Sequence, residues 1–305
     1  MAVEQRVEAP PRRRSGREYL TILKTAFAEF KDDNLTTVAA ALAYYAFLAI
    51  PSVLMVAVGL FGLVSSPSGA ASLVDRLSGV MPEQAQALLR DSLARLTNDK
   101  GTDVTILVVG SLLALWSLTG AMQNVMWGLN IAYERDESRG FVRKRLTALS
   151  MVAFAGGAVL LVFALLVLGP HLINWIGDAV GHESLASWVW WTAQWPILLV
   201  GLLVAFAGIL YLGPNVDHRR WSFLSFGALL AIVLFLVLSG AFAFYASRFG
   251  SYNKTWGSLS AVVVMLTWLW LSSVSLLFGA EVNAVAERSA RATGTPQRFA
   301  GSDRA

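Results

Sequence analysis

Long apolar stretches dominate the chain. Each of six stretches has the roughly 20 apolar residues that a helix needs to cross a bilayer core. One of them, LTALSMVAFAGGAVLLVFALLVLG at residues 146–169, carries no charge and lacks the alternation of a transmembrane β-strand. The pattern therefore predicts an all-α, polytopic membrane protein with six membrane-spanning helices, at about residues 35–64, 104–131, 146–169, 188–213, 221–247 and 258–280.

Two further stretches have the one-sided pattern of amphipathic helices. Residues 17–31 place Tyr19, Ile22, Leu23, Ala26, Phe27 and Phe30 at three- and four-residue spacings. This spacing predicts a helix lying on the cytoplasmic leaflet. A similar pattern in residues 65–103 predicts helices on the outer face, between the first two spans. The membrane domain is thus predicted to cover residues 17–288, between a disordered basic tail at 1–16 and a disordered tail at 289–305.

Composition and charge agree with a membrane protein. Hydrophobic residues make up 56% of the chain and charged residues 14%, whereas soluble domains carry about a quarter charged residues. If the N-terminus is placed on the cytoplasmic side, 18 of the 24 Lys and Arg residues fall on that side of the six predicted spans. Because basic residues are retained in the cytoplasm, both termini are predicted to be cytoplasmic.

A basic patch at residues 135–145 holds five Lys and Arg residues. The charge asymmetry explains this patch as a marker of the cytoplasmic side, so it predicts no nucleic-acid binding. Its charges are expected to lie beside anionic lipid headgroups, each contributing about 1 kcal/mol. The headgroup candidates are Arg139, Arg143, Lys144 and Arg145, with Arg139 the first to test against a lipid phosphate.

Polar residues inside the spans have two interpretations. Gln123 and Asn124 in the second span either bridge helices by hydrogen bonds or line a polar cavity. The first span faces them with Tyr44 and Tyr45 and is predicted to kink at Pro51. The outer loop at 248–260 is either a tight turn or a gate. The candidate substrate path consists of Tyr44, Tyr45, Pro51, Gln123, Asn124, Asn130, Tyr252, Asn253, Glu281 and Asn283.

Catalytic chemistry finds little support in the sequence. The absence of cysteine excludes disulfides and Cys-based zinc sites. His171, Asp178 and His182 would share one face of a helix, but Gly177 and Gly181 are expected to interrupt it, so a solvated loop is the preferred interpretation. No nucleotide-binding or hydrolase motif is present. The sequence therefore predicts no enzymatic activity, no metal and no cofactor.

Four ordered segments resemble the YihY/BrkB-like family of bacterial inner-membrane proteins. They are DDNLTTVAAALAYYAFLAIPSVL at 32–54, GLNIAYERDESRGFVRKR at 128–145, YLGPN at 211–215 and SRFGSYNKTWGSLSAVVVMLTWLWLSSVSLLFGAEVNA at 247–284. The resemblance implies six helices, cytoplasmic termini and a multi-pass location in the bacterial cytoplasmic membrane. It also implies links to serum resistance or to lipopolysaccharide precursors. Members have been labelled ribonuclease BN, a label that the scattered histidines of this chain do not suit.

Two functional hypotheses are favoured over a third, an enzyme such as the ribonuclease of the label. One is a transporter or flippase for a lipidic or amphiphilic envelope substrate, and the other is a non-catalytic scaffold of the cell envelope. Membrane lipids are the expected partners, together with a second copy of the chain or an unidentified envelope protein. A stripe of small residues at Gly201, Ala205 and Gly208 is suited to packing either within the bundle or between protomers.

Overall fold

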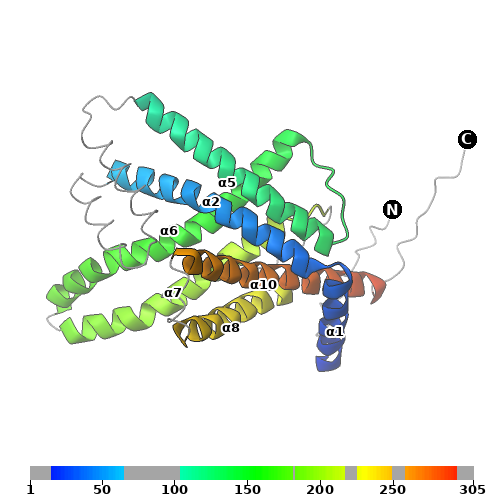
Figure 1. Cartoon of the computed structure of the whole chain (residues 1–305). Coiled ribbons are helices and arrows are strands. Elements are labelled where there is room, and N and C mark those ends of the chain that lie inside the picture. The colour runs from blue at the N-terminus through cyan, green and yellow to red at the C-terminus, as the bar shows by residue number, and fades with distance from the viewer. Residues whose placement is uncertain (1–14, 65–103, 181–182, 217–224, 249–257, 294–305) are drawn as a thin grey trace, which may run out of the picture.

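The computed structural model describes residues 15–64, 104–180, 183–216, 225–248 and 258–293. Over these residues the chain forms seven α-helices and no strand (Figure 1), which confirms the all-α prediction. The helices are α1 (Gly16–Asp32), α2 (Leu35–Val64), α5 (Val104–Ala132), α6 (Phe141–Val180), α7 (Glu183–Leu212), α8 (Phe226–Arg248) and α10 (Ser258–Thr293).

Five of these helices, α2, α6, α7, α8 and α10, are long and apolar enough to cross a membrane. The remaining predicted span, 104–131, coincides with the 29-residue helix α5, which is not among those five. Six spans and cytoplasmic termini therefore stay predictions. The predicted outer-face helices at 65–103 lie outside the described residues, as do most of the two terminal tails.

Three helices extend at least five residues beyond their predicted spans, and one of them, α7, begins at Glu183. Helix α10 runs to Thr293, so the segment after residue 288 begins as helix. Helix α6 has 40 residues and runs to Val180. The prediction of a solvated loop around His171 and Asp178 is therefore wrong, since both residues belong to α6. Gly177 lowers helix propensity by about 1 kcal/mol relative to Ala, which the rest of such a long helix outweighs.

Helix α10 lies at the centre of the bundle and contacts α1, α2, α5, α7 and α8 (Figure 1). The other principal neighbours are α6 with α7 and α2 with α5. A buried apolar cluster joins α2, α5, α7 and α10 through Leu42, Leu129, Leu210 and Leu277. The core thus gathers around the C-terminal half of α10.

Glycines allow the closest helix contacts. A Cβ atom added at Gly227 of α8 would lie 2.1 Å from the carbonyl oxygen of Gly279 of α10. On α7, Gly201 and Gly208 face Leu161 and Phe154 of α6. The small-residue stripe of α7 therefore packs within the bundle, as small residues in membrane helices commonly do.

Helix α1 uses its apolar stripe differently from the prediction. Ile22 and Ala26 are buried against Val282 and Val285 of α10, so protein rather than lipid covers this face. Amphipathic periodicity identifies an apolar face but not what covers it, which explains the error. Ser15 begins the helix with a capping box: its side chain accepts a hydrogen bond from the backbone of Glu18, whose carboxylate accepts one from the Ser15 backbone.

The α8–α10 crossing gives a first testable prediction. Gly227→Ala should lower the free energy of unfolding by about 1–3 kcal/mol, because its methyl group overlaps the α10 backbone. Gly240→Ala in the same helix is the matched control, since nothing lies within 4 Å of its added Cβ atom. That control should be neutral or slightly stabilising. Unfolding of the purified protein in mixed micelles measures both, and equal stabilities would contradict the close crossing.

Candidate functional site

Polar and charged side chains gather where α1, the end of α5, the start of α6, the end of α7 and the C-terminal part of α10 meet. We call this region the charged end. In Figure 1 it lies beside α1. Two hydrogen-bond networks hold it together, one around Arg139 and one around Arg288.

Arg139 lies in the loop between α5 and α6 and is buried. Its Nε and Nη2 atoms donate to the two carboxylate oxygens of Glu137, each at 2.8 Å. Its Nη1 atom donates to the carbonyl of Leu212 at 3.1 Å, and Nη2 also donates to that of Gly213 at 2.7 Å. These carbonyls stand at the C-terminus of α7, where a cation is favoured by the helix dipole. Arg139 therefore fastens the loop to the end of α7.

Asn130 and Asn215 complete this network. Asn130 is buried, donates to Glu137 at 3.1 Å and accepts a hydrogen bond from the backbone N–H of Asn215 at 2.8 Å. The side chain of Asn215 in turn donates to the carbonyl of Asp136 and to the hydroxyl of Ser138. Burial alone would raise the pKa of Glu137, but hydrogen bonds from Arg139 outweigh it and hold the pKa below its usual value. Glu137 is thus kept ionised as the acceptor for Arg139.

The headgroup candidates fall into different environments. The Arg139 side chain is 1% exposed and fully engaged, so the prediction that it meets a lipid phosphate is wrong. Arg143 is exposed and Lys144 is half-buried. The Arg145 guanidinium stacks 3.5 Å from the Trp116 ring centroid and donates to the Trp116 carbonyl. Arg143 and Lys144 remain headgroup candidates.

The second network surrounds Arg288 of α10. Its guanidinium pairs with Glu29 of α1, Glu134 at the end of α5 and Glu281 of α10 itself. Burial, followed by the charges of Glu134 and Glu29, raises the pKa of the nearby Asp33. One arginine thus connects three segments that are far apart in the sequence.

Asn283 ties α10 to the start of α8. Its Oδ1 atom accepts a hydrogen bond from the backbone N–H of Gly227 at 2.9 Å, and its Nδ2 atom donates to the hydroxyl of Ser225 at 3.1 Å. Helix α8 begins at Phe226, so Asn283 satisfies one of the backbone donors that a helix leaves free at its N-terminus. Asn130, Glu281 and Asn283 from the predicted path therefore all belong to the charged end.

The remaining path candidates lie farther along the bundle. Gly128 of α5 faces Val38 and Leu42 of α2, which runs in the opposite direction (Figure 1). One helical turn farther from the charged end, Gln123 and Asn124 of α5 reach the same depth as Tyr44 and Tyr45 of α2. Both amide side chains are half-buried and both tyrosines are exposed.

The structure also gives contacts of the Asn124, Tyr44 and Tyr45 side chains. The Asn124 amide donates to the carbonyl of Gly120 in its own helix at 3.2 Å, and the rings of Tyr44 and Tyr45 meet edge to face. Helix α2 continues through the exposed Pro51 to Val64. Tyr252 and Asn253 lie outside the described residues.

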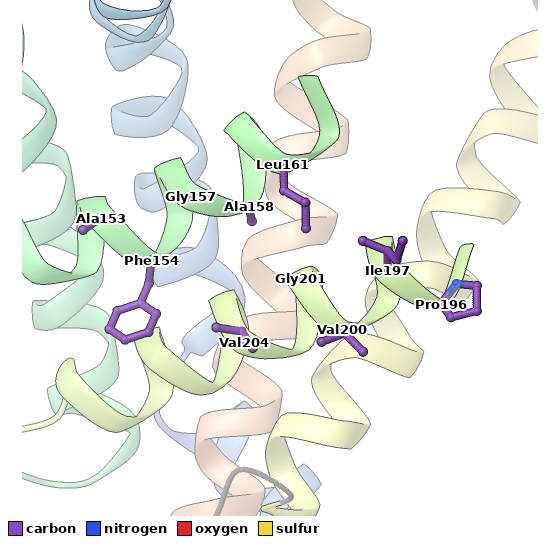
Figure 2. A pocket seen from close by; sticks show the side chains of 10 residues that line it. All are labelled: Ala153, Phe154, Gly157, Ala158, Leu161, Pro196, Ile197, Val200, Gly201 and Val204. Carbon is purple, nitrogen blue, oxygen red and sulfur yellow. The ribbon is translucent and has the colours of Figure 1, made fainter. Parts of the chain in front are cut away.

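Figure 2 shows an apolar groove between α6 and α7. It has a volume of about 610 Å³ and is lined by residues from 153–161 of α6 and 196–204 of α7. Gly157 and Gly201 contribute no side chain to its wall, and every lining residue is apolar. Such a surface is suited to hydrocarbon. Within the described residues, no three His, Cys, Asp or Glu side chains are grouped so that they could hold a metal ion.

Most of the chain matches a known protein family. The family model described as "Virulence factor BrkB" matches residues 26–303. The chain belongs to this family. Residues of three segments that carried the resemblance, 32–54, 128–145 and 247–284, meet around Arg288 or its partners, and residues 211–215 join 128–145 through Arg139.

Several relatives carry names that describe them only broadly. The "Putative ribonuclease-like protein YfkH" of Bacillus subtilis (strain 168) is 26% identical over 266 residues, which cover 87% of this chain and 95% of the relative. A "UPF0761 membrane protein" of Tolumonas auensis is 30% identical over 175 residues, or 54% of this chain and 56% of the relative.

The "UPF0761 membrane protein azo3165" of Azoarcus sp. (strain BH72) is 27% identical over 284 residues, 88% of this chain and 63% of the relative. The chain therefore spans less than two thirds of both UPF0761 relatives. No solved structure matches the chain. Together with the apolar helices, these likenesses identify a membrane protein of the BrkB family.

Sequence reasoning missed most of the partners at the charged end. Glu29, Glu134, Glu137, Asn215 and Arg288 were not candidate residues. The segments YERDESRG and YLGPN contain three of them, and their density of polar and turn-forming residues was the available signal. The hydrogen bonds between the two segments join residues more than 70 positions apart, so neither segment alone could reveal them.

Arg139 yields a prediction that separates a structural role from lipid binding. Arg139→Gln should destabilise the protein by about 3–5 kcal/mol, because it leaves Glu137 unpaired and two α7 carbonyls without their donor. Arg143→Gln, four residues on and exposed, should leave stability within about 0.5 kcal/mol. Unfolding in mixed micelles checks both, and equal stability losses would show that Arg139 does not hold the loop.

Proposed function

We propose that the protein moves a lipidic or amphiphilic substrate of the bacterial envelope across the cytoplasmic membrane. The support comes from the polar band formed by Tyr44, Tyr45, Gln123 and Asn124 at one depth of α2 and α5. Tyr44 stands about 14 Å along α2 from its first residue, close to the middle of a bilayer core about 30 Å thick. Polar groups at that depth are costly unless they meet a partner or water.

One observation carries the proposal. The Asn124 amide donates to its own helix and not to a neighbouring one, so the described contacts give it no role in joining helices. The exposed tyrosines beside it present hydroxyl groups to the surroundings of the bundle. A substrate with a polar headgroup would satisfy these groups as it passes, which favours a path over interhelical bonding.

The distribution of polar and apolar side chains along the bundle also supports a lipidic substrate. The Arg139 and Arg288 networks tie the helices together at the charged end, and large apolar side chains are exposed away from it, including Leu112, Val159 and Val263. The apolar groove between α6 and α7 offers a surface for hydrocarbon chains. We therefore place the polar headgroup at the polar band and leave the chains in contact with apolar surface.

The proposal includes a non-catalytic role. The ribonuclease-like name of the Bacillus relative describes that protein, and the described part of this chain offers no metal-binding cluster for nuclease chemistry. Cytoplasmic termini and the inner membrane are part of the same proposal, and they rest on the charge asymmetry.

A transfer assay tests the path. Purified protein is reconstituted in vesicles with fluorescent phosphatidylglycerol, and dithionite bleaching measures movement between leaflets. Asn124→Leu should slow transfer about tenfold, as expected when a headgroup loses one hydrogen bond of about 1.4 kcal/mol. Gln194→Leu, the same kind of change at a half-buried position of α7, is the control and should transfer at the unchanged rate.

Two outcomes would contradict the proposal. If transfer is no faster than in protein-free vesicles, the lipid-transport hypothesis is excluded and the scaffold hypothesis is favoured. Equal rates for the Asn124→Leu and Gln194→Leu proteins, both folded, would show that the polar band is not the path.

A further inference from the structure

Glu281 is a buried acid that the proposed path does not use. Glu281 is 0% exposed and lies where α1 and the end of α5 meet α10. Its Oε1 atom accepts a hydrogen bond from Nη2 of Arg288 at 3.4 Å, which is long for a charge-assisted bond. Its Oε2 atom is buried and has no hydrogen-bond partner. Burying a carboxylate with an unpaired oxygen is costly, so this position needs a ligand or a proton.

The groups facing Glu281 are mainly acidic. Helix α1 and the following turn present Glu29 and Asp33, and the end of α5 presents Tyr133 and Glu134. Helix α10 adds Arg288, and its Asn283 and Glu287 face the neighbouring Tyr133. Burial raises the pKa of Tyr133, so its phenol stays neutral and adds no negative charge to the cluster.

The single arginine does not balance this cluster. Arg288 contacts Glu29 and Glu134 more closely than it contacts Glu281. Its one positive charge faces the carboxyl groups of Glu29, Asp33, Glu134 and Glu281, which leaves an excess of negative charge if all are ionised. Like charges in a shared site disfavour ionisation of the most buried member. Burial and neighbouring acids raise the pKa of Asp33 in the same cluster, which reports this crowding.

We infer that Glu281 is a proton-binding site whose protonation holds the charged end together. The proton resides on Oε2, the oxygen that lacks a partner, and the resulting hydroxyl can donate to the Glu29 carboxylate of α1. A metal ion is a poorer candidate, because the described residues contain no cluster suited to one.

Loss of this proton has a defined structural consequence. An ionised Glu281 would repel Glu29 and compete with it for Arg288, so α1 and the end of α5 would separate from α10. The assembled charged end is therefore stable at neutral pH and is lost as the pH rises through the point where Glu281 ionises. The proton site does not rest on the proposed function.

Isotope-edited infrared spectroscopy tests the proton directly. Protein labelled with carbon-13 in its glutamate carboxyl groups, reconstituted in vesicles, should show a protonated carboxylic acid band at neutral pH that disappears at alkaline pH. The band should be absent in Glu281→Gln and retained in Glu134→Gln, whose side chain is 62% exposed. A wild-type spectrum without the band, or a band that survives in Glu281→Gln, would overturn the inference.

A distance measurement tests the consequence. The chain has no cysteine, so spin labels attach only at the two introduced cysteines, Lys24→Cys of α1 and Arg135→Cys after α5. The distance between them should lengthen or broaden at alkaline pH in the otherwise unchanged protein and stay constant in the Glu281→Gln background. An identical pH response in both backgrounds would show that ionisation of Glu281 does not cause the change in distance. Neither measurement depends on lipid transfer, so failure of the proton site and failure of the proposed function are distinguishable.

Discussion

The shared guanidinium of Arg288 is the contact on which the charged end depends. It joins Glu29 of α1 and Glu134 after α5 to Glu281 on the central helix. Inside a bilayer, helices gain little by hiding apolar surface from one another, so close packing and polar contacts must hold them in place. Arg288 supplies such a contact where α1 and α5 meet α10, and Arg139 supplies one between the α5–α6 loop and the end of α7.

Close backbone approach is the second constraint, and it reinforces the first. Gly227 and Gly279 let α8 lie directly on α10, and Asn283, one turn beyond Gly279, then reaches the free backbone donor at the start of α8. A larger residue at either glycine would move Asn283 away from that donor. Packing and hydrogen bonding thus stabilise the same α8–α10 crossing.

Sequence patterns predicted the helices well because apolar run length is a local property. The described helices agree with all six predicted spans in approximate position, although α6, α7 and α10 extend farther. Burial of individual charges was not predictable in the same way. Arg139 was grouped with surface charges because counting by side identifies a leaflet, not a depth, and its carbonyl partners lie 73 and 74 residues away. The stripe of α1 was likewise assigned to lipid because its partner on α10 is distant in sequence.

Hydrogen–deuterium exchange on the protein in lipid nanodiscs tests the role of Arg288 most directly. With Arg288→Gln, the account predicts faster exchange along α1 (Gly16–Asp32), because its ionic link to α10 is lost. Protection at the α8–α10 crossing should stay unchanged, since its contacts do not involve Arg288. Unaltered protection of α1 in the variant would contradict the account and show that contacts other than the Arg288 ion pairs hold α1 on α10.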